Sequence, residues 1–505
     1  MDATPKTAER KVASLLIDKL ASVLPKGSKF GVYHVSTPPT LRDPLYSPPP
    51  NQKPDRTYCE SHFLAISIDV TSSDGSVKPV LVLALEAFLY TTKYTTTLFV
   101  SKADSTGYLH LLGLPAGSTS PIRSISTAFI EYLIEERRRK NVQFVVSLFA
   151  RAQDQYLFPG SVENKKKHVL DDKGLVKWWC RVINPIIEAP PLAAKGEAWK
   201  SIKAYLVVPG LDAYETRALV PRTAAAAQNW SFTHPLGILS QLRTKPGTEL
   251  PPRCLIPMYP DDPKSRFRVE LDEEAAKGAQ YKKKGLWKSV HTIDQFWEMM
   301  AFRHECSSGR MTGFLWVVFD TPESRTDEAD SEKVSPQSVL SLKSKTQKQK
   351  AKKKKKLTGI IPLREPHIKT HRKNNLLKKH ALTAYYTWPL TSRGDVIVDD
   401  ADYKQIYELL LRLDFAKIDI AVSSSHRWIR EVGGGKTWGA LVEGTAETPV
   451  AMAQAAEPNG LVVNKMVVNN LSGLVKRKRQ VSGCETTPPV ANVLSAELVR
   501  KKQKN

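Results

Sequence analysis

Long apolar runs dominate the first 320 residues of the chain. They are rich in Val, Ile, Phe, Tyr and Thr, which is typical of strands packed inside a sheet. The runs lie at residues 29–39, 62–70, 78–104, 142–151 and 313–320. Several lack polar alternation, which indicates strands that are buried on both faces. The pattern therefore predicts a central sheet.

Segments with helical spacing of apolar residues separate these runs. At residues 120–141 a Ser-Pro start precedes Ile125, Phe129 and Leu133, which is typical of an amphipathic helix. Further helices are predicted at 1–24, 174–187 and 292–306, together with a helix-like segment at 198–208. The order of strand, loop, helix and strand predicts an α/β (α+β) fold with a central mixed β-sheet surrounded by helices.

Composition divides the chain into one domain, an insertion and a tail. Residues from about 321 to 356 are acidic and then Lys-rich, with almost no aromatic residue, so we expect a disordered insertion. Strand-like and helical runs resume at 358–370 and 381–432 and should complete the same domain. The remainder, 433–505, reads as a disordered tail with basic clusters. The predicted domain therefore spans residues 1–432.

The positive charge of the chain is concentrated outside this predicted domain. The net charge is +24 with an isoelectric point near 9.6, but seventeen basic residues fall within 343–356, 476–479 and 500–504. A mildly basic body with basic arms favours a nuclear address or contact with polyanions over a surface that reads DNA sequence. The "KRKR" cluster at 476–479 is typical of a nuclear import signal.

The chain shows the features of an intracellular protein. Its five cysteines are scattered, odd in number and without Cys-x-x-Cys spacing, which argues against a disulfide framework. The first 24 residues have an acidic second position and a helical rhythm, so no signal peptide is expected. The chain contains no run of about 18 apolar residues, so no membrane span is expected.

Two motifs resemble ligand sites but lack residues that such sites require. "GGGKT" at 433–437 lacks a phosphate-loop glycine, because Arg430 occupies that position. "HIKTH" places His367 and His371 four residues apart, but no Glu follows the first His and no third ligand is evident. No metal site is predicted.

The segment "MYPDDPKSRF" at 258–267 places the adjacent carboxylates Asp261 and Asp262 beside Lys264. Paired carboxylates raise the proton affinity of one member, and a nearby cation opposes this, so the cluster has the composition of an acid/base site. A solvated turn explains the same ten residues and is favoured when they are considered alone.

Two other segments contain residue types that are common in binding sites for anionic or aromatic groups. Neither segment establishes a binding site by itself. The helix start in "SPIRS" offers free amides and Arg123, which suit a pyrophosphate. The span 148–180 is dense in aromatic side chains and includes Trp178 and Trp179. Paired tryptophans on a helix are more often part of a core than of a site.

Taken in order, six segments resemble the fungal histone H3 acetyltransferases of the Rtt (regulator of Ty transposition) family. They are "FVSKADSTGY", "SPIRS", "LFARAQDQYLFP", "KKHVLDDKGLVKWWC", "YPDDPKSRF" and "FWEMMAFRHECSSGR". The resemblance covers about residues 8 to 430. It implies a fold akin to that of the CREB-binding-protein type of acetyltransferase, with acetyl-coenzyme A as co-substrate and no metal.

The resemblance also implies which residues surround the coenzyme. They belong to the end of one strand, the start of the following helix, the aromatic span and the segment before the Trp pair. The implied residues are Ala103, Asp104, Ser105, Pro121, Ile122, Arg123, Ser124, Phe149, Arg151, Gln153, Tyr156, His168, Val169, Leu170 and Trp178.

For catalysis, the resemblance implies that Asp262 accepts a proton, that Asp261 supports it and that Trp179 lies beside the incoming lysine. It further implies that Lys264 is buried and acetylated by the enzyme itself. This assignment is chemically coherent, because a lysine ammonium must lose a proton before its nitrogen attacks a thioester.

The implied substrate is histone H3, with H4, at a core lysine near the point where DNA enters the nucleosome and at tail lysines. Implied partners are histone chaperones of the nucleosome-assembly-protein and anti-silencing-factor types. The implied setting is the nucleus, in replication-coupled nucleosome assembly, the DNA damage response and genome stability. Two alternatives remain open on the residues: a non-enzymatic chromatin or nucleic-acid binder, and an acetyl-coenzyme A enzyme that acts on small molecules.

Overall fold

The computed structural model describes nine stretches of the chain, all within one compact unit, Met1–Ala455. These stretches are residues 14–49, 52–71, 75–115, 118–191, 198–241, 250–276, 286–303, 310–321 and 379–447. Apart from Thr321, the expected insertion lies outside the described residues. The segments 358–370 and 448–505 also lie outside them.

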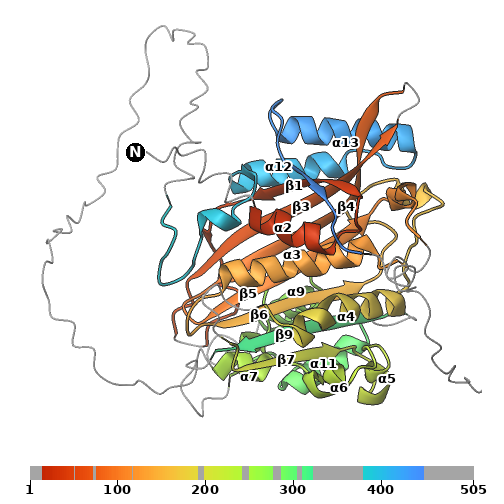
Figure 1. Ribbon diagram of the computed structural model, residues 1–505. Coiled ribbons are helices and arrows are strands. Elements are labelled where there is room, and N and C mark those ends of the chain that lie inside the picture. The colour runs from red at the N-terminus through yellow and green to blue at the C-terminus, as the bar shows by residue number, and fades with distance from the viewer. Residues whose placement is uncertain are drawn as a thin grey trace, which may run out of the picture. The chain divides into compact units, whose positions relative to one another are not determined.

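The described strands form one mixed sheet of eleven (Figure 1). Its path runs β10-β1-β3-β4-β5-β6-β9-β7-β8, while β11 pairs with β1 and β2 pairs with β3. The strands are β1 (Lys29–Ser36), β2 (Thr40–Arg42), β3 (Thr57–Thr71), β4 (Val77–Thr91), β5 (Thr95–Ser105), β6 (Gln143–Arg151), β7 (Ser201–Val207), β8 (Trp230–Ser231), β9 (Thr312–Asp320), β10 (Val396–Ile397) and β11 (Ala440–Glu443). The predicted fold class, a mixed sheet surrounded by helices, is confirmed.

Helices cover both faces of the sheet. The longer ones are α2 (Ser14–Val23), α3 (Pro121–Arg137), α4 (Asp172–Glu188), α9 (Pro263–Ala276), α11 (Ile293–Ala301), α12 (Asp400–Leu411) and α13 (Ile418–Val432). The shorter ones are α5 (Ala213–Arg217), α6 (Ala224–Asn229), α7 (Leu236–Gln241) and α8 (Pro252–Leu255), with 3₁₀ turns η1 (Tyr108–Leu112), η2 (Ser161–Glu163) and η4 (Leu390–Ser392). None of the described helices is long and apolar enough to cross a membrane.

The alternation of side chains along β6 and β9 separates two layers of core. Val146, Leu148 and Leu315 belong to the cluster that includes α3 and α4. Val145 and Trp316 point the other way, into the cluster formed with α9 and α11. Successive residues of a strand face opposite sides, so α3 and α4 lie on one face and α9 and α11 on the other. Consistent with this, Figure 1 shows α2 and α3 side by side on one face.

Strands β5 and β6 are parallel neighbours joined by helix α3. In such a crossover unit the carboxyl ends of both strands lie at the same end of the sheet, and α3 also begins there. Open α/β sheets commonly bind ligands just beyond the carboxyl ends of their strands. This geometry positions the site described below.

The prediction of a helix-like segment at 198–208 is wrong. Residues Ser201–Val207 form β7, which pairs antiparallel with β9 from Ser201↔Asp320 to Val207↔Phe314. Ile202, Ala204 and Leu206 alternate with Lys203 and Tyr205, a period-two pattern in residues of high strand propensity.

The body continues beyond Val432, where the tail was expected to begin. Trp438 packs edge-on against Tyr33, with ring centroids 5.1 Å apart, and its indole N–H donates to the Ile429 carbonyl. Strand β11 then pairs antiparallel with β1. The Gly-rich stretch after Val432 predicts the end of the domain, but in the structure it lies in the connection between α13 and β11.

Candidate active site

A cavity of about 430 Å³ lies at the shared carboxyl ends of β5 and β6. Its walls come from the end of β5, η1, the start of α3, the loop after β6, the segment before α4, and one face of α4. The lining residues are Ala103, Asp104, Ser105, Gly107, Leu109, His110, Ser120, Ile122, Arg123, Ala152, Gln153, Asp154, Tyr156, Lys166, Lys167, His168, Val169, Leu170, Leu175, Trp178 and Arg181.

Asp104 holds the loop after β6 against the end of β5. Its Oδ2 accepts from three consecutive amides, those of Tyr156 at 2.7 Å, Leu157 at 2.8 Å and Phe158 at 3.2 Å. Its Oδ1 accepts from the Ser105 amide at 2.8 Å and from Lys167 Nζ at 2.9 Å. The carboxylate is buried and fully engaged. Asp104 therefore builds the wall of the cavity and leaves no oxygen for a ligand.

The turn after β5 allows the segment before α4 to close the cavity. Gly107 has φ +85°, and a Cβ there would lie 2.7 Å from the Lys167 backbone. Only glycine adopts this left-handed conformation without strain and permits so close an approach. Lys167 in turn bridges Asp104 and Ser161 through its ammonium.

The start of α3 gives the cavity an electropositive side. Pro121 occupies the first turn, and the preceding Ser120 makes no side-chain capping bond. The amides of Arg123 and Ser124 donate to the Ser120 carbonyl, so the attraction for anions comes mainly from the dipole of this 17-residue helix. Arg123 lies on this side of the lining, and other cationic side chains, Lys166 and Arg181, lie on the remaining walls.

The opposite walls are largely apolar and aromatic. Leu175, Trp178 and Arg181 recur at a spacing of three on α4, so one helix face lines the cavity. The Tyr156 hydroxyl donates to the Arg151 carbonyl, and burial raises the pKa of this hydroxyl. Tyr156 is thus a fixed, neutral wall.

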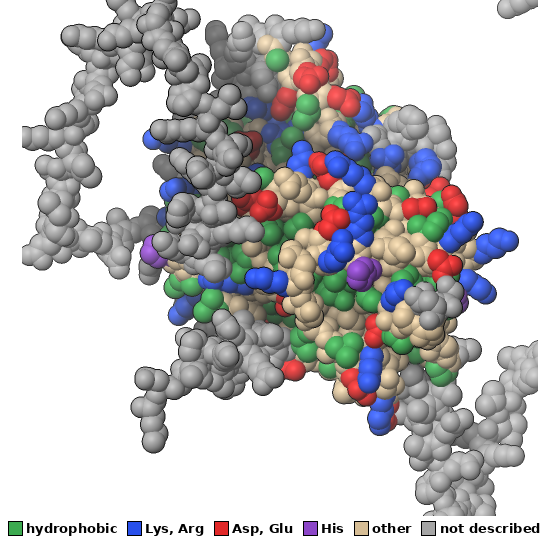
Figure 2. Space-filling model, turned by 90° about the horizontal axis from the view of Figure 1, so that it is seen from above, with side chains coloured by type: hydrophobic (Ala, Val, Ile, Leu, Met, Phe, Trp, Pro, Cys, Tyr) green, Lys and Arg blue, Asp and Glu red, His purple; other side chains and the backbone are tan. Residues whose placement is uncertain are grey.

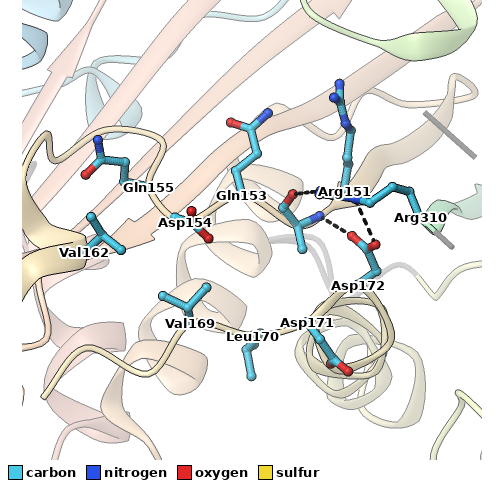
Figure 3. A pocket seen from close by; sticks show the side chains of 11 residues that line it. Arg151, Gln153, Asp154, Gln155, Val162, Val169, Leu170, Asp171, Asp172 and Arg310 are labelled. Carbon is cyan, nitrogen blue, oxygen red and sulfur yellow. Dashed lines mark hydrogen bonds and ion pairs between the residues drawn. The ribbon is translucent and has the colours of Figure 1, made fainter. Parts of the chain in front are cut away.

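A second, more open cavity of about 820 Å³ adjoins the first (Figure 3). Its lining residues are Arg151, Ala152, Gln153, Asp154, Gln155, Val162, Val169, Leu170, Asp171, Asp172 and Arg310. Asp172 anchors this region, because it accepts from the amides of Ala152 and Met311, both at 3.0 Å, and pairs with Arg310 Nε at 3.2 Å. The ends of β6, β9 and α4 are thereby joined at one point.

The structure brings most of the expected coenzyme residues together. Eleven line the smaller cavity, namely Ala103, Asp104, Ser105, Ile122, Arg123, Gln153, Tyr156, His168, Val169, Leu170 and Trp178. Arg151 lines the larger one. Pro121, Ser124 and Phe149 line neither. Phe149 lies on the other face of the sheet, 6.2 Å from the Phe99 ring.

Asp262 and Lys264 also lie on that other face, at the start of α9. Asp262 Oδ2 accepts from Lys264 Nζ at 2.7 Å, and Oδ1 accepts from the Lys264 amide at 3.0 Å. Both side chains are at most 1% exposed. The Lys264 ammonium lies 4.3 Å from the Phe314 ring centroid and 5.5 Å from that of Trp316. Burial lowers the pKa of Lys264, although Asp262 opposes the shift.

Asp261 has a different environment from its neighbour. Its side chain is 55% exposed and pairs with Lys102 Nζ at 2.8 Å. The hydrogen bond from Lys102 lowers the pKa of Asp261. Each carboxylate of the pair therefore has its own cation. The backbone of Asp261 is left-handed, with φ 57°, and this residue turns the chain into α9.

Trp179 is 5% exposed and belongs to the core beneath α4. Its ring meets that of Trp178 edge-on, with centroids 4.7 Å apart, and Trp178 is the member of the pair that lines the smaller cavity. Neither Trp179 nor the Asp261–Lys264 cluster lines either cavity.

Sequence reasoning missed several lining residues, including Leu109, Lys166, Leu175 and Arg181. Two of them had a signal, because Leu175 and Arg181 lie three residues on either side of Trp178 and so share its helix face. Gly107 also had a signal, because a glycine in the turn just after a strand is typical of close backbone approach.

Comparison with known proteins gives a consistent result. Residues 16–143 and 138–431 match the histone acetyltransferase KAT11-type domain. The chain is 36% identical to the histone acetyltransferase rtt109 of Aspergillus flavus, over 98% of this chain and 100% of that protein. It is 32% identical to the histone acetyltransferase rtt109 of Schizosaccharomyces pombe, over 49% of this chain and 58% of that protein.

Among solved structures, Rtt109 from Aspergillus fumigatus matches with a TM-score of 0.66 and 38% identity, over 86% of this chain and 100% of that one. Sequence and fold thus agree over most of the chain. This chain therefore belongs to the KAT11-type histone acetyltransferases, the family of the fungal Rtt109 enzymes.

Proposed function

We propose that this histone acetyltransferase binds acetyl-coenzyme A in the smaller cavity and transfers the acetyl group to lysine side chains of histone H3. The observation that carries the proposal is the pairing of unlike walls in one cavity. One side has the amino-terminal end of α3 with Arg123, and the other has the apolar surface of Leu175 and Trp178.

These walls fit the two kinds of surface on the coenzyme. The start of α3, from Pro121 to Ser124, with Arg181 and Lys166 nearby, suits its phosphates. The end of β5 and residues 168–170 suit the pantetheine chain. When bound, the coenzyme supplies an activated acetyl thioester. The protein orients it and excludes water, with Asp104 fixing the loop that carries Tyr156.

Lys264 is proposed to be acetylated by the enzyme itself. The side chain is enclosed by aromatic rings and faces one carboxylate, and burial already favours its neutral form. Acetylation removes the charge that is costly to bury and leaves an amide N–H that can donate to Asp262. The modification should therefore stabilise the attachment of α9 to the sheet.

Asp262 is proposed to act through Lys264. The family resemblance implies that Asp262 takes the proton of the substrate lysine. Its carboxylate is 0% exposed, and both of its oxygens accept from Lys264. We therefore give Asp262 a positioning role in α9, Asp261 a supporting role through Lys102, and Trp179 a role in holding Trp178.

The substrate and partners follow from the family. We propose H3 bound to H4 as substrate, at the core lysine near the point of DNA entrance and at tail lysines, with delivery by histone chaperones of the nucleosome-assembly-protein and anti-silencing-factor types. The proposed setting is nuclear, in replication-coupled assembly and genome stability. On the face seen in Figure 2, Lys and Arg side chains are interspersed with Asp and Glu, which does not favour reading of DNA sequence by this face.

The basic cluster at 476–479 supports the nuclear assignment. A chain that ends at residue 447 should keep acetyltransfer in vitro and accumulate less in nuclei. Unchanged nuclear accumulation would place the import signal elsewhere.

A two-step experiment tests the proposed function. Acetyl-coenzyme A should raise the melting temperature of the wild type, and the Arg123→Ala variant should show a smaller rise. A radiolabel assay with H3–H4, with and without a chaperone, should show acetyl transfer to H3. Absence of both binding and transfer in the folded wild type would refute the proposal.

A further inference from the structure

The two cavities share one wall. Its residues are Ala152, Gln153, Asp154, Val169 and Leu170. An acetyl thioester held in the smaller cavity must be reached from outside by the amine of the second substrate. The larger cavity adjoins the smaller one and is open to solvent, so it provides such a route (Figure 3).

Asp154 is the carboxylate that lines both cavities. The other acidic side chains around them already have partners. Asp104 is saturated by amides and Lys167, Asp172 is held by two amides and Arg310, and Asp171 caps α4 through the Gly174 amide at 2.7 Å. Asp154 is exposed, and no other described residue donates a hydrogen bond to it or forms an ion pair with it.

The surroundings of Asp154 suit a lysine side chain. Figure 3 places Asp154 between Gln155 and Val169. Val162 and Val169, which are 44% and 36% exposed, offer apolar surface for the aliphatic stem. Gln153 and Gln155 offer amide groups to a peptide backbone.

We propose that the larger cavity admits the lysine-bearing segment of the protein substrate and that Asp154 is a catalytic residue that takes the proton of the lysine ammonium. The inference deepens the proposed function and rests on it, because the smaller cavity must hold the thioester for the shared wall to matter.

The step balances as follows. The ammonium gives one proton to the Asp154 carboxylate and becomes a neutral amine. The amine nitrogen forms a bond to the acetyl carbon, and the bond from that carbon to sulfur breaks. The second proton passes from nitrogen to the leaving thiolate, so the products are an acetamide and a thiol. Asp154 returns its proton to water through the open cavity.

The first test replaces Asp154 by an isosteric amide. Asp154→Asn should lower kcat by roughly 10²- to 10⁴-fold, because it removes general-base catalysis, while the thermal shift with acetyl-coenzyme A stays at the wild-type value. Glu163→Gln is the matched control. Glu163 is an exposed carboxylate in η2 that lines neither cavity, and its variant should keep wild-type kcat.

The second test obstructs the larger cavity. Val162→Arg should raise KM for H3–H4 at least tenfold and leave acetyl-coenzyme A binding unchanged. Its control is Val77→Arg at the start of β4, where an exposed valine lines neither cavity and should tolerate the same change.

The outcomes separate this inference from the proposed function. Wild-type kcat in Asp154→Asn, or a loss explained wholly by weaker acetyl-coenzyme A binding, overturns the role of Asp154. Normal KM for histone in Val162→Arg overturns the substrate route. Either result can occur in an enzyme whose wild type binds acetyl-coenzyme A and acetylates histones, so the proposed function would still stand.

Discussion

Adjacent residues in this protein can have opposite energetic roles, and Asp261 and Asp262 show why. Asp262 is enclosed with Lys264, whereas Asp261 is half exposed and reaches Lys102 across the surface. A buried ion pair is costly to break on one side only, because the remaining charge has no solvent. An exposed pair is screened by water and contributes little. Sequence shows the two carboxylates but not which of them is buried.

Asp262→Asn should therefore destabilise the unacetylated protein by about 3–5 kcal/mol, since Lys264 is left buried without its carboxylate. Asp261→Asn should cost at most about 1 kcal/mol, because Asn also tolerates the left-handed backbone found at this position. Urea unfolding measures both. In the Lys264→Gln background the cost of Asp262→Asn should shrink, and an equal cost in both backgrounds would contradict the pairing.

The charge on Lys264 should also make stability depend on pH. Burial lowers the pKa of Lys264 in the folded protein below its unfolded value of about 10.4. Between these two values the unfolded chain binds more protons, so the free energy of unfolding rises as pH increases through this window. Protein acetylated at Lys264 lacks the titrating group.

The measurement is urea unfolding from pH 8 to 10 on unacetylated and acetylated protein, sorted by intact-mass spectrometry. The unacetylated form should gain stability relative to the acetylated form. Parallel curves would show that Lys264 does not titrate in the fold.

At the scale of elements, the pattern of apolar residues predicted the buried strands and the crossover helix. It did not predict elements whose own apolar pattern is weak or short. The start of α9 falls within 258–267, a segment that favours a turn when it is considered alone, although Asp262 followed by Pro263 is a typical helix start. The buried face of α9 carries the charged residues Lys264 and Arg268 beside Phe267 and Leu271, so the apolar pattern of this face is weak. The prediction of a helix-like segment at β7 is wrong because the alternation of apolar and polar residues in this strand is short. The face of the sheet on which each element packs, and hence the separation of Asp262 from the cavity, depends on tertiary contacts that no local pattern contains.

The loop after β6 depends on one side chain. Asp104→Asn should lower the melting temperature and weaken acetyl-coenzyme A binding. The side-chain amide of Asn accepts hydrogen bonds only at its oxygen, so buried donors that bond the second carboxylate oxygen lose their partner. Each unpaired buried donor costs about 1–3 kcal/mol. Differential scanning fluorimetry with and without acetyl-coenzyme A measures both effects. Asp212→Asn, at the exposed cap of α5, is the control and should change neither. Unaltered coenzyme binding in Asp104→Asn would mean that the loop is held by other contacts.

At the scale of the whole molecule, the described body ends at residue 447, later than composition suggested. A chain truncated after Val432 loses Trp438 and β11, whereas a chain truncated after residue 447 keeps both. The shorter chain should be destabilised by at least 3 kcal/mol, since removal of a packed Trp alone costs about 3–5 kcal/mol. The longer one should melt like the full chain. Equal melting of both truncated chains would show that β11 adds nothing to the body.

The pairing of Lys29 with Glu443 and of Val35 with Val396 has a consequence for biosynthesis. Strand β1 leaves the ribosome early, but its outer partners follow only after most of the chain has been translated. Until then one edge of the nascent sheet has free hydrogen-bonding groups and can pair with other chains. Contacts so distant in sequence also form slowly. Synthesis of this enzyme should therefore depend on chaperones that protect this edge, and prematurely terminated chains should aggregate.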